Sequence, residues 1–415
     1  MKKIFLSIIS CLVVVFSLGT NVFAESEVDN HWIMKNDLPS PLAGSAVAEA
    51  NGKIYVFGGI SGSLTDIKRT VYEYDPINDS WIQKNDMPVT AAASTASTVD
   101  GKIYVFGGYT GNIYTMTGGS VLNSAYIYDP QTDTWEKKQN MPVTKAWASA
   151  VSYEDDIYIV GGIIDSKATT VASVEVYNTK TDSWATRASM PSALHAVGLA
   201  VYNDKIYAVG GGNGITSYKN VREYDPKSNL WADKANLINA KDGSGTVSFN
   251  GVIYSIGGGT TSGDSLGSVE VYNPITDTWK EAPNLNVARS AFGTVVVNGK
   301  IYVVGGAIFN PFKPTKTVEE FTSTSVPTNP TDPEPSGDRA ILTIIMTTGL
   351  EKEFDLSMEE VKAFINWYDA KENGIGPAQY GIDKHNNNKG PFSKRVDYVI
   401  FKNILSFEVD EYTTE

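Results

Sequence analysis

Short stretches of alternating apolar and polar residues follow one another from about residue 31 to residue 321. One unit shows the pattern clearly. Ser45–Ala50 alternates, and it is followed by Asn51-Gly52, a pair typical of a two-residue β-hairpin turn. Lys53–Phe57 is a second apolar stretch, Val71–Pro76 is a third that ends at proline, and Trp81 opens a fourth. This unit therefore predicts four short strands.

The unit recurs at a nearly constant period. Glycine pairs begin at Gly58, Gly107, Gly161, Gly210, Gly257 and Gly305, and tryptophans stand at Trp32, Trp81, Trp135, Trp184, Trp231 and Trp279. Each tryptophan precedes the first glycine of the next pair by 26 residues, so length varies only between a glycine pair and the tryptophan after it. The hairpin turn is expected again at Asp100-Gly101, Asp155-Asp156, Asn203-Asp204, Asn250-Gly251 and Asn298-Gly299. Four strands per period of about 50 residues indicate one propeller blade per repeat.

These repeats resemble the Kelch-repeat family over residues 31 to 321. The resemblance rests on the apolar strand that ends in Gly-Gly, on the turn that opens Tyr-Asp-Pro, Tyr-Asn-Pro or Tyr-Asn-Thr, and on the tryptophan seven residues after that tyrosine. It implies an all-β propeller in which the glycine pairs let strands crowd together and the aromatic residues pack one blade against the next.

The ring should contain six blades and close through the N-terminus. The sixth glycine pair is followed by Val318–Phe321, but no tryptophan strand comes after it. A spare strand of this kind, His31–Lys35, stands at the start of the repeats. Placing it on the outside of the sixth blade completes that blade and covers an otherwise open edge.

Composition divides the chain further. Residues 1–24 read as a signal peptide, residues 25–321 as the propeller, residues 322–337 as a proline-rich linker and residues 338–415 as a small α+β module. In that module, strands are expected at Ala340–Thr347, at Lys352–Leu356 and twice within Val396–Tyr412, and Ser357 with Glu360 should cap a helix. The module resembles one found on secreted clostridial proteins, a resemblance that implies no particular role.

The signal peptide indicates a secreted, extracellular protein. Ile8–Cys11 loosely fits a lipidation box, which leaves attachment to the cell surface open. Loss of Lys2 and Lys3 would change the formal net charge from −13 to −15, which disfavours binding to nucleic acid and adhesion to an anionic membrane. Membrane insertion is not expected either, because no segment after residue 24 is long and apolar enough to cross a bilayer. Cys11 is the one cysteine, so the mature chain would have no disulfide or thiolate nucleophile.

Ligands of such propellers are expected over the central channel, where loops enter the innermost strands and leave the second strands. The equivalent residue of the first loop set is Leu42, Ala91, Lys145, Leu194, Lys241 or Arg289. The resemblance implies that arginine is frequent there, and three blades keep a cation. The candidate ligand-binding residues are therefore Lys145, Trp147, His195, Lys241, Arg289 and, from the second loop set, Tyr109. They would suit an anionic ligand or a sugar. The alternative is that the cations are solvated rim charges, that Trp147 fills the channel and that His195 is a rim or packed residue.

Several enzyme classes can be excluded because the sequence lacks the residues that their chemistry needs. The copper chemistry of galactose-oxidase-like relatives needs a tyrosine crosslinked to cysteine, which the mature chain lacks, and its three scattered histidines do not predict a metal site. No nucleophile and base stand out, so no catalytic residue, metal or cofactor is predicted. A metal-independent sugar mutarotase similar to N-acetylneuraminate epimerase remains the alternative, with Arg289 or Lys145 holding a carboxylate and Glu49, Glu154 or His195 moving protons. The leading interpretation is a non-catalytic protein that binds a protein or glycan partner on its loop face.

Overall fold

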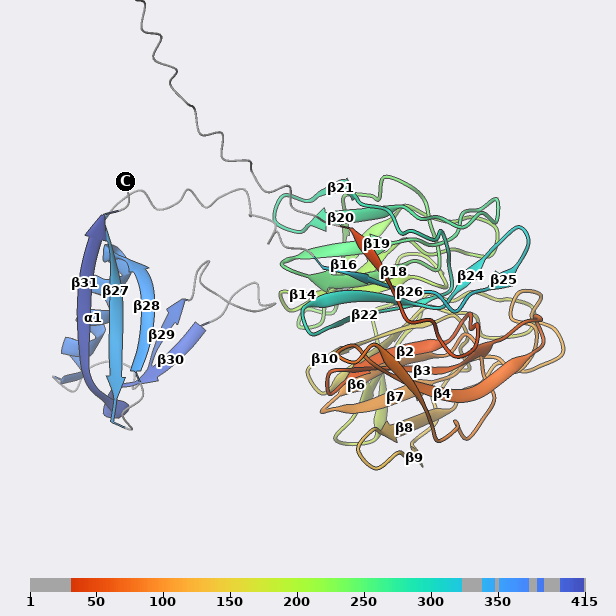
Figure 1. The fold of residues 1–415 in the computed structure, drawn as a ribbon, viewed down its shortest axis with the longest axis horizontal. Coiled ribbons are helices and arrows are strands. Elements are labelled where there is room, and N and C mark those ends of the chain that lie inside the picture. Colours follow the sequence, from red (N-terminus) through yellow and green to blue (C-terminus); the bar gives the residue numbers. More distant parts are fainter. Residues whose placement is uncertain (1–30, 323–337, 348–350, 373–378, 384–395, 414–415) are drawn as a thin grey trace, which may run out of the picture.

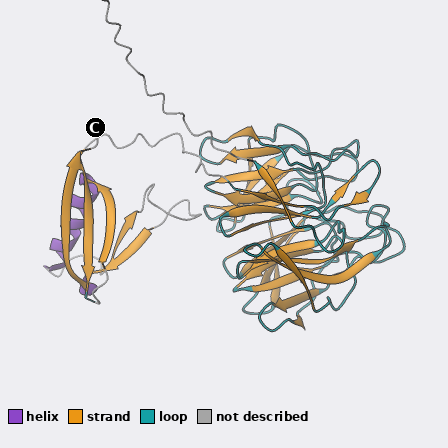
Figure 2. Ribbon diagram, viewed as in Figure 1, coloured by secondary structure: helices purple, strands orange, loops and turns teal. Residues whose placement is uncertain are grey.

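The structure is a computed structural model that describes residues 31–322, 338–347, 351–372, 379–383 and 396–413. Its largest part consists of six four-stranded antiparallel sheets made almost entirely of strands and loops (Figures 1 and 2). The predicted signal peptide and nearly all of the predicted linker lie outside the described residues. Among the described residues, no helix is long and apolar enough to cross a membrane.

In blades 1 to 5, the strands follow one another in the chain from the innermost to the outermost. Blade 1 contains β2 (Ala46–Ala50), β3 (Lys53–Ile60), β4 (Ile67–Asp75) and β5 (Ser80–Lys84). Blade 2 contains β6 (Thr95–Val99), β7 (Lys102–Phe106), β8 (Ala125–Asp129) and β9 (Thr134–Lys137). Blade 3 contains β10 (Ser149–Tyr153), β11 (Asp156–Val160), β12 (Val174–Asn178) and β13 (Ser183–Arg187).

Blades 4 and 5 repeat this order. Blade 4 contains β14 (Gly198–Tyr202), β15 (Lys205–Val209), β16 (Val221–Asp225) and β17 (Leu230–Lys234). Blade 5 contains β18 (Gly245–Phe249), β19 (Val252–Ile256), β20 (Val269–Asn273) and β21 (Thr278–Ala282). Blade 6 differs, because it combines β22 (Gly293–Val297), β23 (Lys300–Val304) and β26 (Val318–Phe321) with β1 (Trp32–Lys35) from the N-terminus. The prediction of six blades closed by the N-terminal strand is therefore confirmed.

One predicted hairpin turn is wrong by one residue. In blade 3, Tyr153 pairs with Asp156, so the turn is formed by Glu154 and Asp155. Asp155, like Gly52 in blade 1, stands six residues before the first glycine of its pair. The misplacement arose because Asp155 lacks the glycine that marks this position in four of the other blades.

Blades 1 to 5 are each fastened to the preceding blade by a repeated polar contact at the outer side. The Tyr177 hydroxyl donates to Asp182 at 2.7 Å, and Asp182 accepts the backbone N–H of Gln139 at 3.0 Å. The Trp184 indole donates to the carbonyl of the same Gln139 at 2.9 Å. The hydrogen bond from Tyr177 holds the pKa of Asp182 below its usual range. Because Gln139 follows β9, these bonds join blade 3 to blade 2.

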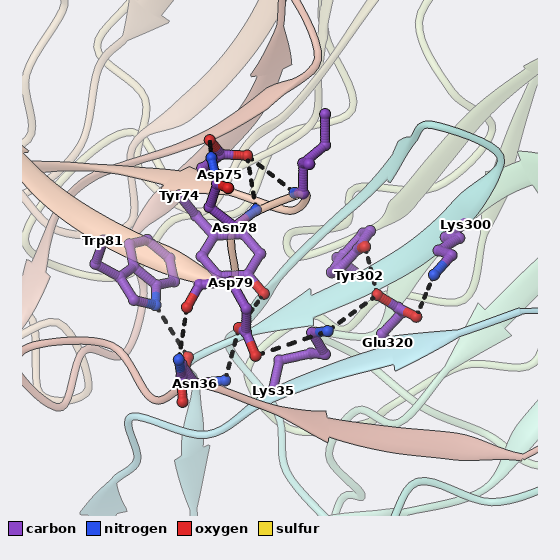
Figure 3. A network of polar contacts seen from close by, with 11 residues as sticks. Lys35, Asn36, Tyr74, Asp75, Asn78, Asp79, Trp81, Lys300, Tyr302 and Glu320 are labelled. Atoms are coloured by element: carbon purple, nitrogen blue, oxygen red, sulfur yellow. Dashed lines mark hydrogen bonds and ion pairs between the residues drawn. The ribbon is translucent and has the colours of Figure 1, made fainter.

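The ring closure repeats this contact and adds charge to it (Figure 3). Trp81 of blade 1 donates to the Asn36 carbonyl at 2.9 Å, and Asp79 accepts the Asn36 N–H at 2.9 Å. Lys35 of β1 lies 3.7 Å from both Asp79 in blade 1 and Glu320 in β26. The N-terminal strand is thereby tied to the last blade and to the first.

The glycine pairs are required where the blades meet. Gly107 has a φ of +59°, and a Cβ on it would lie 2.2 Å from the carbonyl oxygen of Lys145. The N–H of Gly108 donates to the same carbonyl at 2.8 Å. A side chain at Gly107 would therefore both strain the backbone and push the loop of blade 3 away from blade 2.

The C-terminal residues form a small α+β unit of their own. β27 (Asp338–Met346) lies between β28 (Glu351–Ser357) and β31 (Ile404–Thr413), α1 spans Met358–Glu372, and Phe401–Asn403 forms one 3₁₀ turn. Ser357 and Glu360 form the predicted capping box, with the Glu360 N–H donating to the Ser357 hydroxyl at 3.3 Å. A second pair, β29 (Gln379–Asp383) with β30 (Val396–Ile400), includes a strand that was not predicted.

Ring closure should make Trp32 far more important than its position near a chain end implies. Trp32 is buried, packs against Phe321 in a tilted arrangement with ring centroids 5.1 Å apart, and donates to the Pro283 carbonyl at 2.9 Å. We expect Trp32→Ala to lower the free energy of unfolding by about 3–5 kcal/mol. Ile33→Ala, on the exposed side of the same strand, should change it by about 0.5 kcal/mol or less. Denaturant unfolding measures both, and equal small effects would contradict closure by β1.

Candidate functional site

The central channel opens on the loop face, by which we mean the face formed by loops that enter the innermost strands and loops between second and third strands. A closed circle of six backbone hydrogen bonds surrounds the channel there. Each N–H donates to the carbonyl of the equivalent residue in the preceding blade: Gly44 to Ala291 (2.8 Å), Ala93 to Gly44 (2.7 Å), Trp147 to Ala93 (2.9 Å), Ala196 to Trp147 (2.8 Å), Gly243 to Ala196 (3.0 Å) and Ala291 to Gly243 (3.3 Å). We call these six residues the mouth ring.

All members of the mouth ring have left-handed backbone conformations, with φ between +50° and +62°. Alanine and tryptophan adopt this conformation at a cost that glycine does not have. The cost is offset because each such residue both donates to one neighbour and accepts from another around the channel. Trp147 is the only large side chain that the ring presents at the mouth.

The three predicted cations do not reach the mouth. Lys145 is 1% exposed, and Lys241 and Arg289 are 0% exposed. Each pairs with a buried glutamate in its own blade: Lys145 with Glu175, Lys241 with Glu270 at 3.0 Å, and Arg289 with Glu319 at 2.9 Å. The prediction that they bind a ligand is corrected, because a ligand on the loop face cannot contact them.

The paired cations join blades instead. The backbone of Lys145 docks on blade 2, where its N–H donates to the Leu122 carbonyl at 2.9 Å. Its ammonium group donates to the Gly161 carbonyl of blade 3 at 2.7 Å. Burial lowers the pKa of Lys145 and Lys241, and the paired glutamates oppose that shift. Burial lowers the pKa of Arg289 to about 10.

The other blades show why this pairing is structural. Blades 1, 2 and 4 have neither the cation nor the glutamate. The two positions hold Leu42 and Tyr72 in blade 1, Ala91 and Tyr126 in blade 2, and Leu194 and Arg222 in blade 4. Leu42 and Tyr72 lie together in one apolar cluster. Cation and glutamate therefore occur together in blades 3, 5 and 6, and neither occurs in blades 1, 2 and 4.

Tyr109 is also buried, at 0% exposed, and packs in an apolar cluster with Ile60, Ala92, Ile113 and Met116. It does not line the cavity described below, so its assignment as a ligand-binding residue is corrected as well. Its loop nevertheless matters. Residues 113–116 lie over the first three blades, where a Cβ on Gly44 would meet the Ile113 side chain at 3.1 Å.

A cavity of about 310 Å³ lies above the mouth ring, and Trp147 and His195 line it. One wall is aromatic. Tyr114 lies with its ring centroid 6.2 Å from that of Trp147 and 5.2 Å from that of Phe309, which comes from the loop between β24 (Ala307–Ile308) and β25 (Lys313–Pro314). Tyr114 belongs to blade 2 and Phe309 to blade 6, so this wall bridges over blade 1.

The opposite wall is polar and comes from blades 4 and 5. Ser217 donates to Asp242 at 2.8 Å, and His195 forms a backbone bridge with Gly212 beside them. Gly212 allows the Asp242 carboxylate to lie close to the backbone here, because a Cβ on it would be 2.7 Å from that carboxylate. Burial raises the pKa of Asp242, while the Ser217 hydrogen bond and His195 oppose that shift. Burial lowers the pKa of His195, and Asp242 opposes that shift.

Two of the six predicted site residues, Trp147 and His195, thus meet in one cavity, and Lys145, Lys241, Arg289 and Tyr109 do not. The prediction missed Asp242, Ser217, Tyr114 and Phe309. A signal for one of them, Asp242, was present in the sequence. The column one residue after the cations reads Ala43, Ala92, Ala146, His195, Asp242, Ser290, so it is polar only in blades 4 to 6.

No group of three or more histidine, cysteine or acidic residues able to hold a metal ion occurs among the residues that the structure describes. The acid–base candidates Glu49 and Glu154 lie away from the cavity. Glu49 accepts the Gly52 N–H at the hairpin turn of blade 1, and Glu154 stands in the equivalent turn of blade 3. These turns are at the ends of the inner strands opposite the loop face.

The fold and this site define a six-bladed β-propeller with an asymmetric cavity at one channel mouth. A family model, the KLHDC2/KLHL20/DRC7 Kelch-repeats domain, matches residues 13–186 and 95–306, which together are well over half of the 415 residues. The chain belongs to the Kelch-repeat family.

Individual relatives are distant. The chain is 39% identical over 75 residues to an uncharacterized protein of Clostridium acetobutylicum, a match covering 18% of this chain and 19% of that protein. It is 28% identical over 149 residues to beta-scruin of Limulus polyphemus, covering 36% of this chain and 11% of that protein. These matches span only about a fifth and a tenth of the relatives' lengths. The solved structure of YjhT aligns with a TM-score of 0.60 at 16% identity, over 69% of this chain and 97% of that one, which shows a shared fold.

The buried ion pairs lead to a mutational prediction. Lys145→Leu should lower the free energy of unfolding by about 3–5 kcal/mol, because it leaves the Glu175 carboxyl group buried without its cationic partner. The double variant Lys145→Leu/Glu175→Tyr, which copies blade 1, should recover most of that loss. Denaturant unfolding of the two variants checks this. A double variant as unstable as the single one would contradict the structural role.

His195 should titrate below its usual pKa of about 6.5. Because the negative charge of Asp242 favours protonated His195, Asp242→Asn should lower the pKa of His195 further. NMR titration of the imidazole signals in the parent chain and the variant measures both values. An increase in the variant would show that the two side chains do not interact as the structure indicates.

Proposed function

We propose that this chain is a secreted binding protein that holds a sugar unit of a glycan in the loop-face cavity. The observation that carries the proposal is the cavity's pair of unlike walls. Trp147, Tyr114 and Phe309 supply aromatic faces, and His195, Ser217 and Asp242 supply hydrogen-bonding groups across from them. Small-ligand sites commonly combine apolar area with a few placed polar groups in this way.

A glycan is favoured over a flat protein surface by the shape and size of the site. A cavity of about 310 Å³ is at the lower end of the range for small-ligand sites, and one or two sugar rings would fill it. Five serine and threonine residues also line it: Thr216, Ser217, Thr260, Thr261 and Ser290. Hydroxyl-bearing ligands can exchange hydrogen bonds with such groups without needing a charge.

Secretion is part of this proposal and rests on the organisation of residues 1–24, which have a basic start, an apolar run and small residues before Glu25. An exported protein whose first residue is Glu25 would support it. A glycan in the surroundings of the cell is the kind of partner that such a protein would meet.

A sugar mutarotase is the second candidate, and one observation favours it. Burial moves the pKa values of Asp242 and His195 in opposite directions within one cavity, an arrangement found in acid–base sites. The cations first considered for holding a substrate carboxylate, Arg289 and Lys145, are buried and paired. Such an enzyme would therefore have to accept a sugar without help from them. Acceleration of sugar-ring mutarotation in NMR spectra would favour this candidate.

The binding proposal predicts that Trp147→Ala weakens glycan affinity at least about tenfold, because an aromatic wall is removed. The backbone should tolerate the change, since Ala93, Ala196 and Ala291 hold equivalent positions with φ between +50° and +55°. A glycan array with the full chain would identify the ligand, and calorimetry would compare affinities. The Lys145→Leu/Glu175→Tyr variant should bind like the parent. If the control variant lost binding and Trp147→Ala did not, the ligand would have to bind at the buried cations and not in the loop-face cavity.

A further inference from the structure

The charge of the cavity allows its ligand to be specified further, and this step rests on the proposed function. Two carboxylates line the cavity, Asp242 on the polar wall and Asp264 on an exposed loop of blade 5. Within the described residues, no lysine or arginine lines it. The histidine beside Asp242 favours its neutral form because burial lowers the pKa of His195. The cavity therefore carries net negative charge.

Asp242 lacks a cationic partner among the groups described around it. Its Oδ2 atom accepts one hydrogen bond, from the Ser217 hydroxyl at 2.8 Å. It is largely withdrawn from solvent, and burial raises its pKa, which means that its charged form is destabilised. A ligand cation placed against this carboxylate would relieve that cost. In contrast, each buried cation of the propeller already has its own glutamate.

The aromatic wall also suits a cation. Trp147, Tyr114 and Phe309 present ring faces and edges within one group, with neighbouring centroids 5.2 and 6.2 Å apart. A cation near an aromatic ring face is attracted by the ring quadrupole, most strongly where water is excluded. The same rings can pack against the apolar face of a sugar. A ligand that matches the aromatic faces, the carboxylate and the hydroxyl side chains would have an apolar ring face, a cationic group and hydroxyl groups of its own.

We propose that the cavity selects an amino sugar with a free ammonium group, that is, a 2-amino-2-deoxyhexose unit of a glycan. The ammonium group pairs with Asp242, the sugar ring packs on the aromatic wall, and the hydroxyl groups meet the serine and threonine side chains of blades 4 to 6. An acetylated amine carries no charge and would leave the Asp242 carboxylate buried without a cation. An acidic sugar would be repelled by Asp242 and Asp264.

The test uses three oligosaccharide series of equal length and the same β-1,4 linkage, which differ only in the group at carbon 2. These are glucosamine oligomers with an ammonium group, N-acetylglucosamine oligomers with an acetamide, and glucose oligomers with a hydroxyl. Calorimetry with the full chain should show binding of the glucosamine series at least about tenfold tighter than of the other two, the size expected for a hydrogen bond to a charged group.

Asp242→Asn should reduce this preference to about threefold or less, because only the glucosamine series loses a charged partner when the carboxylate is replaced by a neutral amide. Asp233→Asn is the matched control, because it removes the same charge from a side chain that is 83% exposed on the outer strand β17. It should keep the preference, which separates pairing at the site from general attraction to an acidic chain. Trp147→Ala should weaken all three series.

The outcomes separate the two levels of the proposal. Equal binding of the three series, or tighter binding of the acetylated one, would refute the amino-sugar inference and leave glycan binding standing. Absence of binding to any glycan would refute both. Binding of a lysine-containing peptide in preference to the glucosamine oligomers would show that the cavity recognises an ammonium group on a protein, and the amino-sugar inference would then be wrong.

Discussion

The six backbone hydrogen bonds of the mouth ring constrain the rest of the propeller. Each N–H reaches the carbonyl of the preceding blade only if all six blades stand at the same height and spacing around the channel. The residue two positions earlier, such as Lys145, must then dock its carbonyl on the glycine pair of the preceding blade, where a Cβ would lie 2.2 Å from it. The regular spacing of tryptophans and glycine pairs follows from this requirement, because each blade has to deliver the same atoms to the same places. Closure by β1 completes the circle, since Lys35 and Asn36 join the last blade to the first.

A regular ring by itself produces a symmetric channel, and function requires that the symmetry be broken. The loop of blade 2 does this by placing Ile113 and Met116 over the first three blades, where the column after the cations holds only alanine. Over blades 4 to 6 the same column holds His195, Asp242 and Ser290, and the cavity opens there. The blade 2 loop thus covers the part of the mouth that holds alanine, and the cavity opens over the part that holds the polar residues. Different residues also serve structure and binding, because the ion pairs lie inside the blades and the candidate ligand groups lie above them at the channel mouth.

The sequence was sufficient to predict the blade count, the closing strand and the capped helix, because each depends on local patterns with strong physical requirements. The hairpin pairs, the glycine pairs and the Ser357–Glu360 box are of this kind. It was insufficient to assign the role of the three cations. A lysine at a loop position such as Lys145 is expected to be accessible, and its burial against Glu175, thirty residues later, depends on how the strands pack. Tyr114 and Phe309 are about 200 residues apart and come together only through loop conformation. The column containing His195 and Asp242 could have been found, because its change from alanine to polar residues halfway around the ring is visible in the repeats.

The most direct test is an NMR titration of the tryptophan indole N–H signals of the full chain with glucosamine oligomers, with Trp147→Ala assigning its signal. The six blade tryptophans donate to carbonyls of neighbouring blades at the outer side of the ring, whereas Trp147 lines the cavity. A ligand in the cavity should shift the Trp147 signal and leave those six in place. Shifts of the blade tryptophans or of Trp367 in the C-terminal unit, with Trp147 unchanged, would place binding elsewhere and contradict the assignment of the loop-face cavity.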